Sequence, residues 1–214
     1  MTEIRLHGRG GQGTVTAAEL LAKAAFYDGK HSQAFPSFGV ERRGAPVSAF
    51  CRIDDKPIRL REQIYNPDYI IIQDPGLIGT DPQILSGAEK CRGILINSSQ
   101  DKSAFVKTTA DALRNKNVVA INATEIAIKY IGKPFFNTAL CAAFSAMTGI
   151  VGLESLKKAA ADLLGEDVLQ ANIDSMEVAF DYIKKLKHEY LAVAKPRFGE
   201  ARRNPKKSEA REGS

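Results

Sequence analysis

The sequence predicts an α/β fold: a mostly parallel, Rossmann-like sheet flanked by helices, with a helical C-terminal third. Two observations carry this prediction. Aliphatic, β-branched runs such as Tyr69–Gln73 and Ile94–Asn97 are typical of strands buried on both faces of a parallel sheet. From Asn137 onward, small apolar and amphipathic segments at helical spacing replace these runs. Strands with interposed helices, followed by helices alone, indicate a single domain over residues 1–193.

Each element follows from a local pattern. Ile4 and Leu6 alternate with polar neighbours as in a short strand, and a helix is expected over Thr14–Asp28, with Gly29 as its stop signal. Further strands are expected at Ser32–Phe35, Val47–Ile53, Tyr69–Gln73, Ile94–Asn97 and Val118–Ile121, with Ile58–Leu60 completing a hairpin and Phe105–Thr108 forming a short edge strand. Further helices are expected at Glu125–Ile131, Asn137–Thr148, Leu153–Leu164 and Val168–Val193, the last of them broken near Asn172.

The composition limits the classes of function. The chain has 214 residues, 44% of them hydrophobic, and no apolar run approaches the roughly 20 residues that a membrane span needs. The first residues contain no basic stretch followed by an apolar segment, so we expect no secretion signal and a cytoplasmic location. We also expect that this protein does not bind a membrane.

The net charge of +5 belongs to the end of the chain. Residues 184–214 hold 10 Lys or Arg and 4 Asp or Glu, whereas residues 1–183 hold 20 and 21. Residues 194–214 are therefore expected to form a basic, extended tail that is solvated or contacts a partner subunit. Nucleic acid is not an expected partner, because no recognition helix or interleaved aromatic pattern accompanies the charge. A regulatory binding module would rest on this tail alone.

The residues that could ligate a metal are scattered. Cys51, Cys91 and Cys141 are far apart and form no Cys-x-x-Cys pair, so we expect three reduced thiols and no zinc or iron–sulfur site. His7 lies beside the first glycine turn, where a structural role is expected. The other two histidines have no neighbouring residues that suggest a metal site. No catalytic residue is predicted in this chain.

A glycine-rich turn links the first strand to the first helix. Gly8, Gly10 and Gly13 match the G-x-G-x-x-G spacing, which would allow a tight turn, close approach of a ligand, and close packing of helix on strand. The acidic residue that holds the ribose in dinucleotide folds is missing, because the second strand ends at Phe35–Pro36. A stand-alone NAD(P)- or FAD-binding oxidoreductase remains the alternative function. The plain structural explanation is that the glycines only permit the turn.

Three further residues strengthen the case for an anion site at this turn. Gly11 exposes more backbone than the usual fingerprint, and Gln12 adds a side-chain amide that can donate and accept hydrogen bonds. Arg9 supplies a cation beside the turn. We therefore expect a phosphate, diphosphate or oxyanion to bind at the start of the helix.

A second loop, Pro36–Pro46, could fold over the glycine turn. It combines two prolines and two glycines with aromatic and charged residues, which indicates an ordered loop. The strand Tyr69–Gln73 ends at the turn Asp74–Gly76, and ligands of open α/β sheets bind at such carboxyl ends.

The two loops together resemble a known family. Gly8-Arg9-Gly10-Gly11-Gln12-Gly13, followed by Phe35-Pro36-Ser37-Phe38-Gly39-Val40-Glu41-Arg42-Arg43-Gly44-Ala45-Pro46, is similar to the gamma subunit of the 2-oxoacid:ferredoxin oxidoreductases, such as the pyruvate and ketoisovalerate enzymes. The similarity covers about residues 1–190 and includes the strand that ends Gln73-Asp74-Pro75. The basic tail after Lys195 is not part of the family's usual pattern.

The resemblance implies an enzyme that works only as a complex. Such complexes decarboxylate a 2-oxoacid on thiamine diphosphate, pass electrons through iron–sulfur clusters to ferredoxin or another acceptor, and form an acyl-CoA. The gamma subunit resembles the domain that closes over the active site when coenzyme A binds, and thiamine diphosphate and the clusters are held by partner subunits of the alpha, beta and delta types. This chain alone is expected to hold neither.

The resemblance also marks the expected ligand contacts. By match to the first motif, Gly8, Arg9, Gly10, Gly11, Gln12, Gly13 and Thr14 are the expected cofactor-binding residues. Thr14 is equally explained as a helix N-cap. Arg42 and Arg43 are expected to pair with a phosphate of coenzyme A or with a substrate carboxylate, and an inter-subunit salt bridge explains them equally well.

Overall fold

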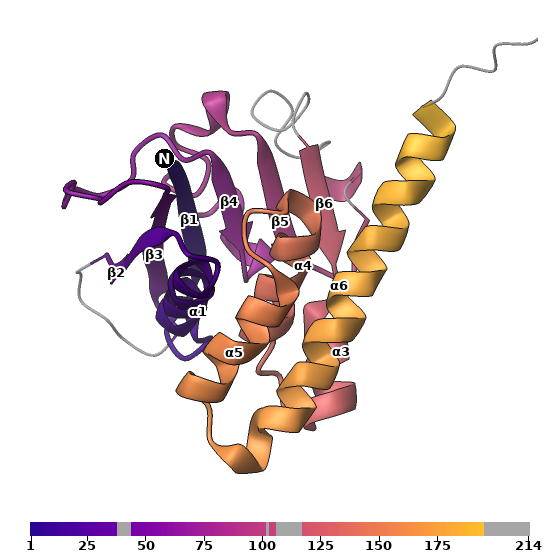
Figure 1. The fold of residues 1–214 in the computed structure, drawn as a ribbon. Helices are drawn as coiled ribbons and strands as arrows, with labels where there is room; N and C mark the ends of the chain where they lie inside the picture. Colours follow the sequence, from indigo (N-terminus) through magenta and orange to yellow (C-terminus); the bar gives the residue numbers. More distant parts are fainter. Residues whose placement is uncertain (38–43, 102, 106–116, 195–214) are drawn as a thin grey trace, which may run out of the picture.

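The computed structural model describes residues 1–37, 44–101, 103–105 and 117–194, and for residues 187–194 it describes the backbone alone. Six strands form one sheet in the order β2-β3-β1-β4-β5-β6 (Figure 1). The strands are β1 (Thr2–Arg9), β2 (His31–Pro36), β3 (Pro46–Asp54), β4 (Tyr69–Ile72), β5 (Gly93–Asn97) and β6 (Asn117–Ile121). The helices of the described residues are α1 (Thr14–Tyr27), α3 (Ala123–Ile131), α4 (Asn137–Thr148), α5 (Leu153–Leu163) and α6 (Glu166–Ala194).

The sheet is mostly parallel, as the sequence predicts. Strands β1, β4, β5 and β6 run parallel to one another, and β3 is antiparallel to both of its neighbours, β1 and β2. The chain therefore moves from β1 to one side of the sheet, forms β2 and β3 there, and then crosses to the other side to form β4. Such a reversal at β1 and β4 opens a crevice between the two loops that leave their carboxyl ends.

One face of the sheet packs against the helices. Ile4 and Leu6 of β1, together with Ile71 and Leu95, enter a core shared with the small residues of α1 and α4. Ten of the twelve residues of α4 are buried, which confirms the prediction from its small apolar sequence. Figure 1 shows α1, α4, α5 and α6 in front of the sheet. This helical layer brings the N-termini of α1 and α4 to the carboxyl edge of the sheet.

The opposite face is covered differently. Ile70, Ile72, Ile94 and Ile96 point to a second core, closed mainly by irregular chain and by the 3₁₀ turns η1 (Pro75–Leu77) and η2 (Ala88–Lys90). Because both faces are apolar, β4 and β5 are buried on both sides, as their continuous aliphatic runs predict.

Three expected elements differ from the structure. Residues 58–60 form no strand, so the predicted hairpin is wrong. The side chains of these residues are partly or fully exposed, so no strand pairing is needed to bury them. Helix α6 is continuous through Asn172, because that side chain donates to the Val168 carbonyl and accepts from Thr138 within the packed α4–α6 interface. Phe105 lies in a helical turn, not a strand, while residues 106–108 and the predicted tail from residue 195 lie outside the described residues.

A buried cation supports β1 on the face away from the helices. Arg5 is 6% exposed, and its guanidinium donates hydrogen bonds to five backbone carbonyls in two separate loop segments. These carbonyls belong to Ile64, Tyr65, Gln83, Ile84 and Ser86. Arg5 therefore clamps the β3–β4 and β4–β5 connections beneath the first strand.

His7 completes this polar network. Its Nε2 accepts from Arg5 Nε at 2.9 Å, so its Nδ1 carries the proton and donates to Ser48 Oγ at 2.9 Å. Burial, and second the positive charge of Arg5, lower the pKa of His7 to about 3. His7 is therefore buried and hydrogen-bonded through both ring nitrogens, which agrees with the expected structural role.

The depressed pKa of His7 predicts acid sensitivity. Between about 3 in the folded state and an ordinary unfolded value near 6.5, the unfolded chain binds more protons, so stability falls as the pH falls through that window. One such group contributes at most about 1.4 kcal/mol per pH unit. We expect His7→Gln, whose amide can still accept from Arg5, to lose less stability than the parent between pH 6.5 and pH 4. Urea unfolding midpoints across this range would measure the difference, and parallel pH profiles for the two proteins would contradict it.

Candidate functional site

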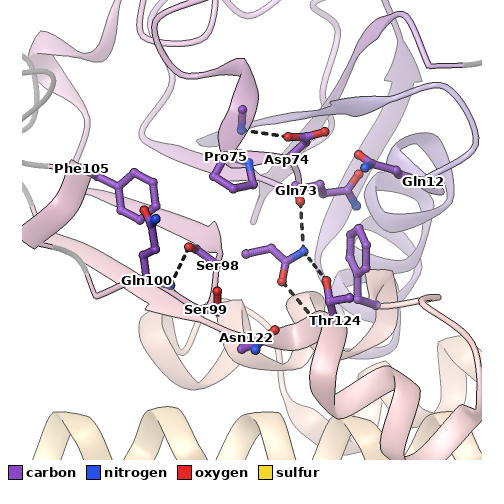
Figure 2. Close-up of a pocket in the computed structure, with 13 residues that line it drawn as sticks. Gln12, Gln73, Asp74, Pro75, Ser98, Ser99, Gln100, Phe105, Asn122 and Thr124 are labelled. Carbon is purple, nitrogen blue, oxygen red and sulfur yellow. Dashed lines mark hydrogen bonds between the residues drawn. The ribbon is translucent and has the colours of Figure 1, made fainter.

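A cavity of about 700 Å³ lies at the carboxyl edge of the parallel strands (Figure 2). Its walls come from the loops that follow β1, β4, β5 and β6, and most of its polar groups are neutral. Asp74 is the one charged side chain among the described residues of the lining. The lining residues are Gln12, Gln73, Asp74, Pro75, Gly76, Asn97, Ser98, Ser99, Gln100, Phe105, Asn122, Thr124 and Phe136.

The glycine turn forms one side of this cavity, with roles that differ in part from those expected. Gly8 lies in β1, not in the turn, and a Cβ placed on it would come within 2.4 Å of Thr14 Oγ1 and 2.5 Å of Gln73 Oε1. Gly11 and Gly13 have positive φ angles of 95° and 70°, so they make the turn itself. Gly13 approaches Asn137 of α4, rather than setting helix against strand.

Some backbone groups of the turn already form hydrogen bonds within the chain. Gly10 donates to the Ala45 carbonyl at 2.9 Å and accepts from the Gly44 amide at 3.1 Å. Gln12 Oε1 accepts from the Arg9 amide at 2.8 Å, which leaves the Gln12 NH₂ group at the cavity. The turn therefore keeps its shape through internal bonds and presents a side-chain donor.

Arg9 is an ion-pair partner in this structure. Its Nε lies 2.6 Å from Asp74 Oδ2, and its Nη1 donates to the Gly44 carbonyl at 3.3 Å. Asp74 also accepts from the Gly76 amide and so caps η1. Arg9 thus joins the turns after β1 and β4 and the end of the Pro36–Pro46 loop.

Thr14 points into the protein. It is the first residue of α1, and Gly13 is the N-cap, so the N-cap explanation of Thr14 is wrong. Its buried hydroxyl donates to Gln73 Oε1 at 2.6 Å. Because that oxygen is occupied, the carboxamide of Gln73 presents its Nε2 elsewhere, and this buried atom has no hydrogen-bond partner among the described residues.

Two other strand ends hold the cavity together. Asn97, at the end of β5, donates to the Gln73 carbonyl at 3.0 Å and to Thr124 Oγ1 at 2.9 Å, and it accepts from the Thr124 amide. Asn122 accepts from the Glu125 amide and donates to the Glu125 carboxylate, which closes the N-terminus of α3. Both carboxamides are therefore structural.

The fold around this site matches a known family. The family model described as "Pyruvate ferredoxin/flavodoxin oxidoreductase" matches residues 3–182, which is most of the chain. The chain belongs to the pyruvate ferredoxin/flavodoxin oxidoreductase family. The resemblance of the two loop motifs to this group is thereby confirmed.

Relatives of this oxidoreductase family match along nearly their whole length. "Pyruvate synthase subunit PorC" of Methanocaldococcus jannaschii is 50% identical over 185 residues, which cover 86% of this chain and 98% of the relative. "Pyruvate/ketoisovalerate oxidoreductases common subunit gamma" of Thermococcus litoralis is 44% identical over 183 residues, or 85% of this chain and 96% of the relative. The crystal structure of pyruvate oxidoreductase subunit PORC of Thermotoga maritima is 35% identical, with a TM-score of 0.72 over 84% of this chain and 95% of that one.

The oxidoreductase family fold differs from a dinucleotide-binding fold where the ribose would bind. In the latter, the second strand lies next to the first and its end carries the ribose-binding acid. Here β3 separates β2 from β1, so β2 lies two strand spacings, about 10 Å, from β1 instead of one spacing, about 5 Å. Both the missing acid and the strand order therefore disfavour the alternative of a stand-alone NAD(P)- or FAD-binding enzyme.

The second expected ligand loop of this family member is only partly described. Arg42 and Arg43 lie outside the described residues, so their role stays a prediction. The loop's last residues are tied to the glycine turn through Gly44 and Ala45. Cys51, Cys91 and Cys141 are buried, and burial raises the pKa of Cys51 to about 12. No helix in the described ranges is long and apolar enough to cross a membrane.

Sequence reasoning missed two polar residues beside the glycine turn. The sequence indicates Gln73 only as the end of a strand in the family pattern, and this strand-end position is the available signal. Asn137 gave no signal, because its proximity to Gly13 arises from the packing of α4 beside α1.

Proposed function

We propose that this chain, as the gamma subunit of a 2-oxoacid:ferredoxin oxidoreductase, binds coenzyme A at the carboxyl edge of its sheet and helps to close the active site. The complex would oxidatively decarboxylate a 2-oxoacid to an acyl-CoA and pass the electrons to ferredoxin or a related acceptor. Thiamine diphosphate and iron–sulfur clusters would be supplied by alpha, beta and delta-type partner subunits.

The observation that carries this proposal is the cavity at the reversal between β1 and β4. Gln12 of the glycine turn lines it on one side, and the end of the Pro36–Pro46 loop is hydrogen-bonded to Gly10 of the same turn. Coenzyme A is a phosphate-bearing acceptor, and N–H groups at helix N-termini are suited to phosphate. The thiol of the bound coenzyme would accept the acyl group, while residues of this chain bind the coenzyme and exclude water.

In this proposal the redox centres lie outside this chain. No group of three metal-ligating side chains occurs in the described ranges, and the three thiols are buried within the two cores. The thiamine diphosphate and the clusters belong to the proposed partners.

The proposal predicts a selective loss of coenzyme A affinity when negative charge replaces the Gln12 amide. In Gln12→Glu, a carboxylate oxygen can still accept from the Arg9 amide, while the NH₂ group becomes a repelling oxygen. We expect the KM for coenzyme A in the assembled complex to rise roughly tenfold, with the KM for the 2-oxoacid unchanged. Steady-state kinetics with each substrate varied in turn would measure this.

The matched control adds the same charge elsewhere. Gln170→Glu lies on the exposed surface of α6, and we expect its kinetic constants to stay within twofold of the parent.

Arg42→Ala and Arg43→Ala separate the two explanations of the arginines in the Pro36–Pro46 loop. A raised KM for coenzyme A indicates phosphate contact, whereas loss of co-purifying subunits indicates an inter-subunit salt bridge. An unchanged KM for coenzyme A in Gln12→Glu and both arginine variants would refute coenzyme binding by this chain.

A further inference from the structure

Two helix N-termini meet beside the cavity without side-chain caps. Gly13 is the N-cap of α1 and Phe136 that of α4, and neither helix has a side-chain cap bond or an acidic residue in its first turn. A Cβ placed on Gly13 would lie 2.9 Å from Asn137 Nδ2, so the two ends are in contact. By contrast, α3 on the same cavity is closed by Asn122. The positive ends of α1 and α4 are therefore left open to an anion.

Three side-chain NH₂ groups surround this pair of helix ends. Gln73 Nε2 is buried without a hydrogen-bond partner within the part of the chain that the structure describes, and Gln12 and Asn137 carry two further NH₂ groups beside the same helix ends. The oxygens of Gln12 and Gln73 are turned away, because they accept from the Arg9 amide and the Thr14 hydroxyl. Gln12 and Gln73 thus present donors and withhold acceptors.

Gln73 is the most informative member of the cluster. It is 1% exposed, its Nε2 is buried without a partner, and its backbone amide and carbonyl are already bonded to His7 and Asn97. Figure 2 shows its side chain directed toward Gln12. A buried donor without an acceptor is costly, and a ligand oxygen would remove that cost.

The charges around the cluster favour an anion rich in oxygen. Asp74, the one charged group in the described lining, is already paired with Arg9. A phosphoryl group offers several oxygens to donors that converge from different elements, and two positive helix ends stabilise its charge.

We propose that the NH₂ groups of Gln12, Gln73 and Asn137 hold a phosphoryl group of coenzyme A at the paired N-termini of α1 and α4. This inference rests on the proposed function and adds Gln73 and Asn137 to the binding residues. Thr14 is then a positioning residue, because its hydroxyl fixes the orientation of the Gln73 carboxamide.

The test compares acceptors that differ in their phosphates, using the assembled complex. Gln73→Met and Asn137→Ala each remove one donor, and we expect each to raise the KM for coenzyme A roughly tenfold. With pantetheine, which lacks every phosphate, kcat/KM should stay within twofold of the parent. A merely structural role would reduce activity with both acceptors equally. Asn122→Ala removes a carboxamide that is already partnered, and it should leave the preference for coenzyme A over pantetheine unchanged.

Dephospho-coenzyme A identifies the phosphate concerned. If the defect persists with this acceptor, the diphosphate is held; if it disappears, the 3′-phosphate is held; both results support the inference. An unchanged KM for coenzyme A in both variants, or equal losses with pantetheine, would overturn it. If Gln73→Met prevents assembly of the complex, Asn137→Ala decides alone. If Gln12→Glu or an arginine variant raises the KM and these two variants do not, the proposed function stands and this inference fails; if none of these variants raises the KM, both fail.

Discussion

Gly8→Ala is expected to destabilise this protein by about 2–3 kcal/mol and to remove its contribution to coenzyme A binding. The added methyl group would lie 2.4 Å from Thr14 Oγ1, 2.5 Å from Gln73 Oε1 and 3.1 Å from Gln12 Oε1. The first two distances are shorter than any ordinary contact, so the Thr14 hydroxyl and the Gln73 carboxamide would have to leave their present positions. The hydrogen bond that orients Gln73 would be lost with them.

Thermal unfolding of the purified chain measures the first effect. A loss of 2–3 kcal/mol corresponds to a fall in Tm of roughly 4–12 °C for a domain of this size. Gly152→Ala is the matched control, because Gly152 has φ −77° and its nearest neighbour to a new Cβ is an Asp28 carboxylate oxygen at 3.3 Å. We expect this control to change stability by less than about 1 kcal/mol. Equal Tm values for the two variants would show that Gly8 is not the close contact described above.

Arg5→Met is expected to be at least as damaging, at about 3 kcal/mol or more. The substitution keeps an apolar stem of similar length and removes the donors of five carbonyls from two loop segments. His7 would lose the donor to its Nε2 as well. Because the clamp lies beneath β1, we expect loosening of residues 64–65 and 83–86 before global unfolding.

Hydrogen exchange and urea unfolding test this clamp together. In Arg5→Met, the amides of the two loop segments should exchange faster, and the unfolding midpoint should fall. Arg5→Lys keeps the charge with three donors instead of five, so an intermediate loss is expected. Arg92→Met breaks an exposed ion pair with Asp68 and should cost less than about 1 kcal/mol. Similar losses for Arg5→Met and Arg92→Met would contradict the clamp.

Much of the fold could be predicted because its signals are local. Strands β4 and β5 are continuous aliphatic runs, and α4 is small and apolar throughout, so the side-chain pattern alone reveals the element. The failures are of a different kind. The break expected near Asn172 assumed that a polar residue interrupts a helix, whereas the buried contact with Thr138 satisfies it.

The candidate site was predictable in outline and not in detail. The glycine turn is at the expected carboxyl edge, and Gln12 lines the cavity there. Arg9 was expected to serve a ligand, and in this structure it is paired with Asp74, a residue 65 positions away in the sequence. Thr14 was expected at the ligand or as a cap, and it contacts Gln73 across the sheet edge. Such partners depend on strand order, which no local pattern contains.

The amino-acid sequence by itself determined most of the strands and helices and the two loop motifs that mark the family, because periodicity and glycine spacing act within a few residues of the chain. Only the tertiary structure decided which polar groups hydrogen-bond within the chain and which remain available to a ligand. The order β3-β1-β4 places Gln73 against Thr14, and the packing of α4 beside α1 brings Asn137 to Gly13. A hydrogen bond needs its partner within about 3 Å, and that proximity is a property of the folded chain.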